Sequence, residues 1–298
     1  MSDQAVRLDN EVRDAKVVRS GGITSMEPDT RRTISRIVPS ESERKAGALG
    51  SETIERASRC FRADGALIIE DIVDTAIITA ARGAFDLAYS HYLDGSKHED
   101  ALTVGERRFL ITIRLEPPFD DPRLFANPYL LSVVSAALDN RFVLGAFGVV
   151  CSLPSAPAQH KHDDGGLSLF PQSDLNRVLP AIAITVGIPL LEMNEVHGTT
   201  ALWLGSHRSA VKEAAIEPLV REGSCMLWDF RLKHCGTANR SALPRPLLYL
   251  TYCRPWFVEY MNFNAKKNPK QKPLLATKTF LSSLPKQHQR LLRRAQEG

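Results

Sequence analysis

Three side chains, His162, Asp164 and His234, have the residue types and spacing of a metal centre. His162 and Asp164 are two residues apart, and side chains two apart on an extended strand point to the same face. An imidazole and a carboxylate on one face, joined by a second imidazole from a distant segment, form the 2-His-1-carboxylate triad. This triad holds non-haem Fe(II) and leaves coordination positions open. The pattern therefore predicts a ferrous site.

The register of the first pair is the main alternative within this pattern. A His-x-Asp pair occurs by chance in many proteins, so the spacing alone is weak evidence for a metal site. His160, His162 and Asp164 all alternate onto one face, which makes His160 with His162 a rival pair. We favour His162 and Asp164 as ligands, and we expect His160 to line the pocket.

An arginine follows the distal histidine at the start of an apolar run that is typical of a strand. The planar guanidinium of Arg245 suits bidentate binding of a carboxylate. The alternative is a surface arginine at a strand start, because Pro244 and Pro246 flank it. Its position relative to His234 favours a carboxylate anchor for a co-substrate bound at the open coordination positions. Arg254 is the second candidate for this role.

Composition indicates a chain that can bury a full core without crossing a membrane. Its 298 residues are 43% hydrophobic, and no apolar run reaches the roughly 18 residues that indicate a membrane span. The first residues lack the order of a signal peptide, and the five cysteines form no Cys-x-x-Cys pair, which favours a reducing, cytoplasmic setting. We expect one large catalytic domain, residues 49–262, rather than two.

The two ends of the chain differ in composition from this domain. Residues 1–48 are polar and charged with no sustained period, which predicts a loosely attached, flexible N-terminal extension. Residues 263–298 form a basic tail, in which the stretch from 266 onward has nine Lys/Arg and one acidic residue. Because few aromatics are interleaved with these charges, we interpret the tail as a solvated segment with a docking helix and expect no nucleic-acid partner.

Periodicity divides the domain into a helical first half and a strand-rich second half. Apolar residues at helical spacing predict helices over 51–64, 73–92 and 127–138. Runs rich in Val, Ile, Leu, Thr or Tyr predict strands over 66–70, 141–151, 179–191, 199–204, 224–230 and 246–253. This order is typical of a mainly β protein with flanking helices (α+β), whose core is a jelly-roll, cupin-like double-stranded β-helix.

Several ordered motifs resemble the phytanoyl-CoA dioxygenase family of Fe(II)/2-oxoglutarate-dependent oxygenases. The resemblance covers roughly residues 55–260. It is carried by Phe61-Arg-Ala-Asp-Gly65 before an apolar strand, Gln159-x-x-His162-x-Asp164, Gly198 through Gly205-Ser206-His207, Asp229-x-Arg231-x-x-His234-x-Gly236-x-x-Asn239, and finally Arg245. Several motifs in one order are much more specific than any one of them.

The resemblance implies roles for individual positions. The implied Fe(II) ligands are His162, Asp164 and His234. The implied 2-oxoglutarate residues are Arg245, which would bind the distal carboxylate, together with Gln159 and Thr185. The candidates for the substrate side are Arg108, Arg114 and His160. O2 would be the second co-substrate, and hydroxylation of a C–H bond would release succinate and CO2. The implied partner is a small molecule, such as a secondary metabolite, without a membrane partner; a homodimer is compatible with the sequence.

Two positions bear on the details of this implied chemistry. Gly236 departs from the family, which often has a small hydroxyl residue there that helps to bind 2-oxoglutarate. Asp164 favours hydroxylation over halogenation, because a halogenase needs the carboxylate replaced so that chloride can bind. Desaturation, cyclisation or epimerisation stays open, as do a non-catalytic ligand-binding barrel and a zinc hydrolase. Residues 104–108 and 165–174 are candidates for a lid.

Overall fold

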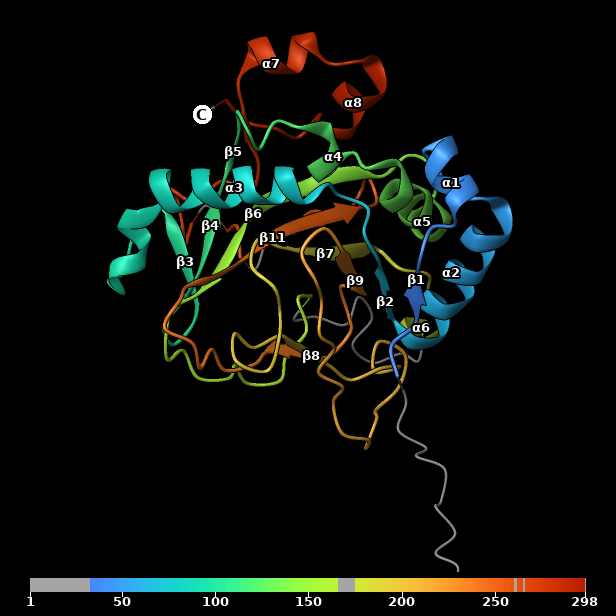
Figure 1. Ribbon diagram of the computed structural model, residues 1–298, viewed down its shortest axis with the longest axis horizontal. Coiled ribbons are helices and arrows are strands. Elements are labelled where there is room, and N and C mark those ends of the chain that lie inside the picture. Colours follow the sequence, from blue (N-terminus) through green and yellow to red (C-terminus); the bar gives the residue numbers. More distant parts are fainter. Residues whose placement is uncertain (1–32, 166–174, 260–261, 265, 298) are drawn as a thin grey trace, which may run out of the picture. The chain divides into compact units, whose positions relative to one another are not determined.

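The main element of the fold is an eight-stranded mixed sheet (Figure 1). The computed structural model describes residues 33–165, 175–259, 262–264 and 266–297. The strands in sheet order are β1 (Arg36–Ile37), β2 (Ala66–Ile69), β9 (Cys225–Asp229), β7 (Ala183–Pro189), β11 (Arg245–Cys253), β6 (Val143–Ser152), β4 (Arg108–Thr112) and β3 (Ala101–Gly105). Only β1 and β2 are parallel neighbours in this sheet; the other neighbours are antiparallel.

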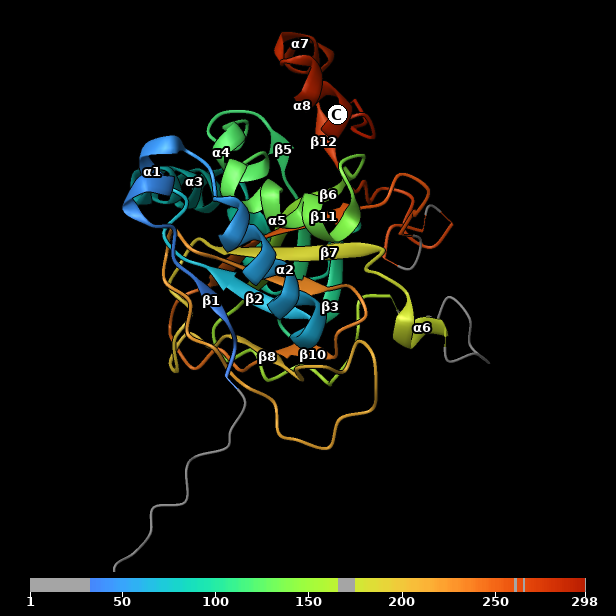
Figure 2. The same cartoon turned by 90° about the vertical axis from the view of Figure 1, so that its right-hand side faces the viewer.

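Smaller sheets and helices surround the main sheet. One two-stranded sheet pairs β8 (Thr200–Leu202) with β10 (His234–Gly236), and another pairs β5 (Arg114–Leu115) with β12 (Leu275–Ala276). The described helices are α1 (Glu41–Ala46), α2 (Ser51–Asp64), α3 (Thr75–Ala88), η1 (Ser90–Asp94), α4 (Pro122–Phe125), α5 (Pro128–Leu138), α6 (Leu175–Val178), α7 (Lys278–Ser283) and α8 (Lys286–Leu291). In Figures 1 and 2, α3 and α5 lie on one side of the main sheet and β8 lies on the other. The predicted jelly-roll core with flanking helices is confirmed.

Alternation along the strands divides the interior into two cores. On β11, Leu248 and Leu250 belong to the core shared with the helices, whereas Leu247 and Tyr249 belong to the core between the main sheet and β8. Because both faces are buried, the strand is a continuous apolar run rather than an alternating one. Arg245 has the same parity as Leu247, so it points between the two sheets.

The N-terminal boundary lies earlier than the sequence predicts. The expected loose attachment of residues 1–48 is wrong for residues 36–46, because Ile37 is buried in the core on β1 and α1 begins with a capping box. In that box, the Ser40 hydroxyl accepts a bond from the backbone N–H of Glu43 while the Glu43 carboxylate accepts one from Ser40 N–H. Residues 1–32 lie outside the described part of the chain.

The C-terminal tail packs against the domain through two short helices, where one docking helix is expected. Leu292 is fully buried, Leu291 is nearly so, and the ring of Phe280 lies 6.4 Å from that of Phe125 in an edge-to-face contact. The ammonium group of Lys278 forms an ion pair of 2.7 Å with Glu297.

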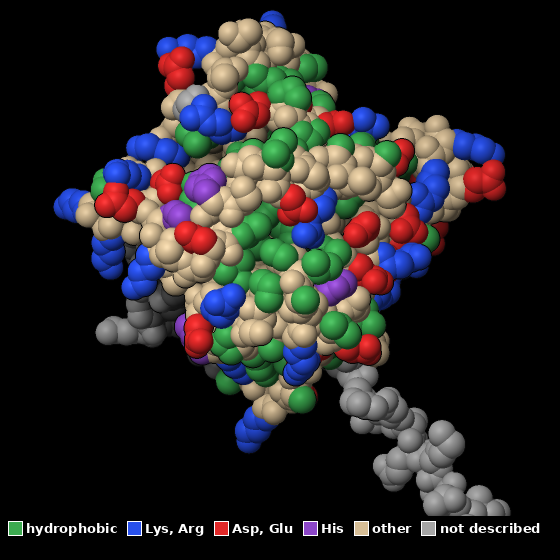
Figure 3. Space-filling model, turned by 60° about the vertical axis from the view of Figure 1, so that its left-hand side comes forward, with side chains coloured by type: hydrophobic (Ala, Val, Ile, Leu, Met, Phe, Trp, Pro, Cys, Tyr) green, Lys and Arg blue, Asp and Glu red, His purple; other side chains and the backbone are tan. Residues whose placement is uncertain are grey.

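On the face in Figure 3, basic and acidic side chains are interspersed. Within the described residues, no helix has the length and apolar character needed to span a membrane.

Candidate metal centre and co-substrate pocket

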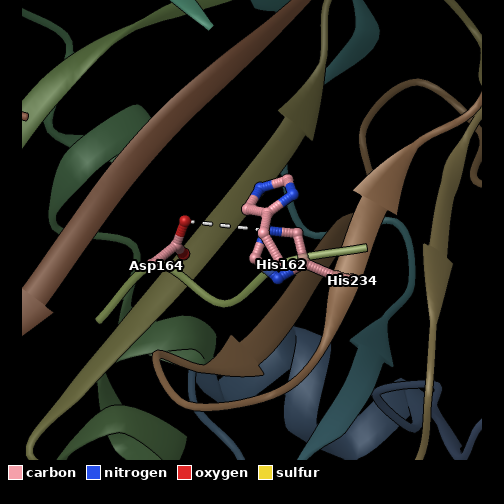
Figure 4. A group of neighbouring side chains, drawn as sticks. All are labelled: His162, Asp164 and His234. Atoms are coloured by element: carbon pink, nitrogen blue, oxygen red, sulfur yellow. Dashed lines mark ion pairs between the residues drawn. The ribbon is translucent and has the colours of Figure 1, made fainter. Parts of the chain in front are cut away.

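His162, Asp164 and His234 come together at the end of the two-stranded sheet of β8 and β10 where β10 begins. Their ligand atoms all lie within 4.8 Å of one another. Figure 4 shows the Asp164 carboxylate pointing towards the two imidazole rings. The ring centroids of His162 and His234 are 4.5 Å apart. His160 lies beside this group, with its ring 5.4 Å from that of His162, but it is exposed and does not belong to the cluster.

A single backbone bridge, rather than a long strand, brings the two histidines together. His162 and His234 exchange both backbone hydrogen bonds, at 3.0 and 2.8 Å, in an isolated antiparallel bridge. Two residues further along the chain, the backbone N–H of Asp164 donates a hydrogen bond to the carbonyl of Phe230 at 3.2 Å. The expectation of an extended strand through His162 is therefore wrong in extent, although one bridge suffices to aim both side chains into one space.

Backbone carbonyls select the tautomer of both imidazoles. Nδ1 of His162 lies 2.8 Å from the carbonyl of His160, and Nδ1 of His234 lies 2.9 Å from that of Leu232. A carbonyl only accepts hydrogen bonds, so each Nδ1 carries a proton, and in the neutral imidazole that binds a metal it is Nε2 that has the lone pair. Burial lowers the pKa of His162, which favours its neutral form. Burial also disfavours charge on His234, but the Asp164 carboxylate outweighs it and raises that pKa.

Asp164 has a different environment at each carboxylate oxygen. Oδ1 lies 3.5 Å from Nε2 of His234, whereas Oδ2 accepts hydrogen bonds from Thr185 Oγ1 at 2.7 Å and Trp228 Nε1 at 3.3 Å. Burial raises the pKa of Asp164, but interaction with His234 and the hydrogen bond from Thr185 outweigh it, so the pKa is lowered and the ionised form is favoured. Thr185, predicted to line the co-substrate pocket, instead lies behind Asp164, and sequence reasoning did not single out Trp228.

The triad opens into a cavity of about 440 Å³. Its wall is mainly apolar, and its apolar members include Val104, Leu110, Val150, Trp228, Leu247 and Tyr249. His160 and Asn262 also line it. Two buried arginines, Arg108 and Arg245, lie in the same cavity, with exposed fractions of 1% and 2%. The pocket therefore combines a metal-ligand cluster, two buried cations and an apolar wall.

The two arginines reach the cavity through the register of three neighbouring strands. Arg108 on β4 and Arg245 on β11 are both cross-strand partners of Ser152 on the intervening β6. Facing residues in adjacent strands point to the same side of the sheet, so both guanidinium groups project from one row. The prediction from sequence reached Arg245 through its distance from His234, whereas nothing local distinguished Arg108 from a charged turn.

Neither guanidinium has its full set of partners among the described residues. Arg245 donates to Ser152 Oγ at 2.9 Å and the carbonyl of Thr199 at 3.2 Å, and Arg108 donates to the carbonyl of Thr237 at 3.0 Å. The Nε atoms of both arginines have no hydrogen-bond partner in the described residues. Burial lowers the pKa of Arg245 to about 9, with a further contribution from Arg108, and burial lowers that of Arg108 to about 10. Such paired buried cations favour an anionic ligand.

Gly236 makes room for Arg108. A Cβ atom at position 236 would lie 1.7 Å from Nη1 of Arg108 and 2.8 Å from Oε1 of Gln159. Oε1 of Gln159 accepts hydrogen bonds from that guanidinium at 3.1 Å and from the N–H of Gly236 at 2.7 Å. The departure from the family at Gly236 is thus explained, because the guanidinium of Arg108 occupies the space of a side chain there.

Other predicted positions lie elsewhere. Arg114 is exposed on β5, because the chain leaves the main sheet after β4, and it does not line this cavity; its proposed substrate role is withdrawn. Arg254 forms an ion pair of 2.8 Å with Asp139 away from the cavity. Of the two candidate lids, residues 104–105 line the cavity, whereas residues 166–174 lie outside the described residues.

A protein-family model for phytanoyl-CoA dioxygenase (PhyH) matches residues 61–247, which is more than half of the chain. The chain belongs to this family. HygX from Streptomyces hygroscopicus, solved with nickel and 2-oxoglutarate, is similar at 17% identity, covers 71% of this chain and 90% of its own, and has a TM-score of 0.53. The carbocyclase SnoK from nogalamycin biosynthesis gives 18% identity, 72% and 87% coverage and a TM-score of 0.52.

The residues present fit the cofactors of the family. Two imidazole Nε2 atoms and one carboxylate oxygen are the donor set of a non-haem Fe(II) site. Two buried guanidinium groups without a carboxylate among their described partners suit a dicarboxylic co-substrate. Family and donor set together identify an oxidoreductase that depends on Fe(II), 2-oxoglutarate and O2.

Proposed function

We propose that this enzyme hydroxylates an unactivated C–H bond of a small-molecule substrate, with succinate and CO2 as co-products. The observation that carries the proposal is the shared cavity, in which the metal-ligand cluster and two buried arginines lie beside an apolar wall. A volume of about 440 Å³ suits a dicarboxylate together with part of a small molecule. Iron with 2-oxoglutarate and O2 supplies the oxidant when bound.

The proposed roles of the protein's own residues follow from their contacts. His162, Asp164 and His234 hold the metal with fixed donor atoms. Arg245 and Arg108 bind carboxylate oxygens of 2-oxoglutarate, and this ligand supplies the negative charge that the two buried cations lack. In this role Arg108 serves the co-substrate rather than the substrate.

Other residues position these groups and shape the substrate space. Gln159 holds the guanidinium of Arg108 through Oε1, while its Nε2 donates to the carbonyl of Val104. Leu110, Val150 and Leu247 exclude water from the reacting carbon. His160 lies at the rim, where it contacts the substrate.

The outcome of the reaction follows from substrate placement. Asp164 occupies the ligand position that a halogenase leaves free, so oxygen transfer is the favoured outcome. The epimerase SnoN, similar at 16% identity with a TM-score of 0.50 over 69% of this chain and 82% of its own, and the carbocyclase SnoK have other outcomes on this fold. Product analysis by mass is therefore part of the test, since hydroxylation adds one oxygen atom whereas cyclisation and epimerisation do not.

The test is anaerobic reconstitution with Fe(II) and 2-oxoglutarate, followed by a small-molecule screen for substrate-stimulated succinate release in air. His162→Ala and Asp164→Ala should each abolish turnover and weaken Fe(II) binding, whereas His160→Ala should keep both measurable. Loss of Fe(II) binding in His160→Ala with normal binding in His162→Ala would reverse the assignment of ligands. The cytoplasmic setting, favoured by five free cysteines, and a homodimeric assembly stay predictions.

A further inference from the structure

The two hydrogen bonds to Asp164 converge on one of its two carboxylate oxygens. Thr185 Oγ1 and Trp228 Nε1 both donate to Oδ2, while Oδ1 faces Nε2 of His234 at 3.5 Å. A carboxylate oxygen has two lone pairs, so two donors satisfy Oδ2. Only Oδ1 is left with its lone pairs available to a metal.

Strand register places both donors. Thr185 on β7 and Trp228 on β9 are direct cross-strand partners, and both side chains point between the two sheets. Thr185 is fully buried and Trp228 is 2% exposed, so water does not compete strongly for these bonds. The indole ring also lies 5.3 Å from the ring of His234, so it contacts two members of the triad.

We propose that Thr185 and Trp228 are positioning residues that restrict Asp164 to metal binding through one oxygen. The inference rests on the proposed metal and co-substrate site. A carboxylate that binds through both oxygens occupies two coordination positions instead of one. Because Thr185 and Trp228 hold Oδ2, this oxygen does not bind the metal. The coordination position that it would occupy then stays open for 2-oxoglutarate or O2.

The experiment uses Co(II) and 2-oxoglutarate as probes, because the visible absorption of Co(II) reports its coordination and needs no turnover. Thr185→Val removes the hydroxyl with little change in shape, and Trp228→Phe removes the indole N–H but keeps an aromatic ring. Thr185→Ser retains the hydroxyl. The matched control is Thr251→Val, because Thr251 on β11 is also buried, is the cross-strand partner of Thr185 on β7 and has no hydrogen bond to Asp164 among those described.

The double variant combines Thr185→Val with Trp228→Phe. In this variant, the 2-oxoglutarate concentration that half-saturates the spectral change of the Co(II) protein should rise about 10- to 100-fold. Its spectrum before addition of 2-oxoglutarate should also differ from that of wild type. Each single variant should show a smaller shift in the same direction, and Thr185→Ser and Thr251→Val should match wild type. Thermal unfolding of each apo-protein identifies variants that fail to fold, and the single variants then provide the test.

Two negative outcomes have different meanings. If wild type binds neither Co(II) nor 2-oxoglutarate, the proposed function fails. If wild type binds both, and Thr185→Val and Trp228→Phe respond to 2-oxoglutarate as wild type does, the site stands and the positioning role is refuted. Equal defects in Thr185→Val and Thr185→Ser would also refute it, because the hydroxyl would then be irrelevant.

Discussion

Replacement of Arg245 by Met should separate ligand affinity from stability. The wild-type guanidinium is 2% exposed, and none of its described hydrogen-bond partners is a carboxylate. Its charge is therefore an unfavourable contribution to the apo-protein and a favourable one once an anion binds. Met fills much of the same space without the charge, so the two effects should change in opposite directions.

The magnitude follows from the hydrogen bonds that a carboxylate would form with Arg245. Two charge-assisted bonds contribute about 1.5–3 kcal/mol each. Part of this loss is offset, because the substitution also removes a buried charge that is unfavourable without a ligand, and Arg108 still attracts the ligand. The net loss of binding free energy is therefore expected to be about 3 kcal/mol. Because about 1.4 kcal/mol corresponds to a factor of ten, the Kd for 2-oxoglutarate should rise roughly 100-fold. The unfolding free energy of the apo-protein should change by less than about 1 kcal/mol or increase.

The assay is anaerobic calorimetric titration of 2-oxoglutarate into the Fe(II) protein, with thermal unfolding of the apo-protein in parallel. Arg254→Met is the matched control, because Arg254 is partly buried, forms an ion pair with Asp139 and does not line the cavity. It should leave the 2-oxoglutarate affinity unchanged and lower stability. A Kd for Arg245→Met within twofold of wild type would refute the assignment of Arg245 as the carboxylate anchor.

Two further predictions concern space and pH. Gly236→Ala should displace the Arg108 guanidinium, because the added Cβ would lie 1.7 Å from its Nη1. A loss of about 1.4 kcal/mol of binding free energy would raise the 2-oxoglutarate Kd about tenfold in the same titration. An unchanged Kd would contradict this prediction. Backbone N–H groups of Ser40 and Gly50 lower the pKa of Glu43 from 4.5 to about 2, so its ionised form stabilises the fold above pH 4.5, and this contribution is lost as the pH falls towards 2. Glu43→Gln should therefore lower the urea midpoint at pH 7 and approach wild type near pH 2, and a pH-independent difference would argue against the linkage.

Elements with strong periodicity could be predicted from the sequence. The helix expected over 51–64 matches α2, and the strand expected over 246–253 matches β11 to within one residue. The helix expected over 73–92 is two elements in the structure. The α-helix α3 ends at Ala88, because the α-helical hydrogen bonds stop at Tyr89, and the 3₁₀ turn η1 follows. Long apolar runs fix such elements, whereas their ends depend on local hydrogen bonds.

The hairpin of β3 and β4 could not be predicted because its turn has unusual residues. Glu106 and Arg107 connect the two strands, and Arg107 has a φ of 51°, a conformation that Gly or Asn adopts more readily. No strand pattern marks this charged stretch, so the sequence predicts only a candidate lid over residues 104–108. Arg108 therefore appeared only as a weak candidate, although it is among the largest fully buried side chains of the described residues.

The candidate site shows which part of the information is local and which is not. The His-x-Asp spacing and the distal histidine are local motifs, and the bridge between His162 and His234 joins them. The partners of the triad are different, because Thr185 and Trp228 are ordinary members of apolar strands when each strand is read alone. Only the pairing of β7 with β9 brings both to one carboxylate oxygen, just as the pairing of β4, β6 and β11 aligns the two arginines. A shift of one residue in either pairing would turn these side chains towards the helices, so strand register is itself a determinant of the chemistry.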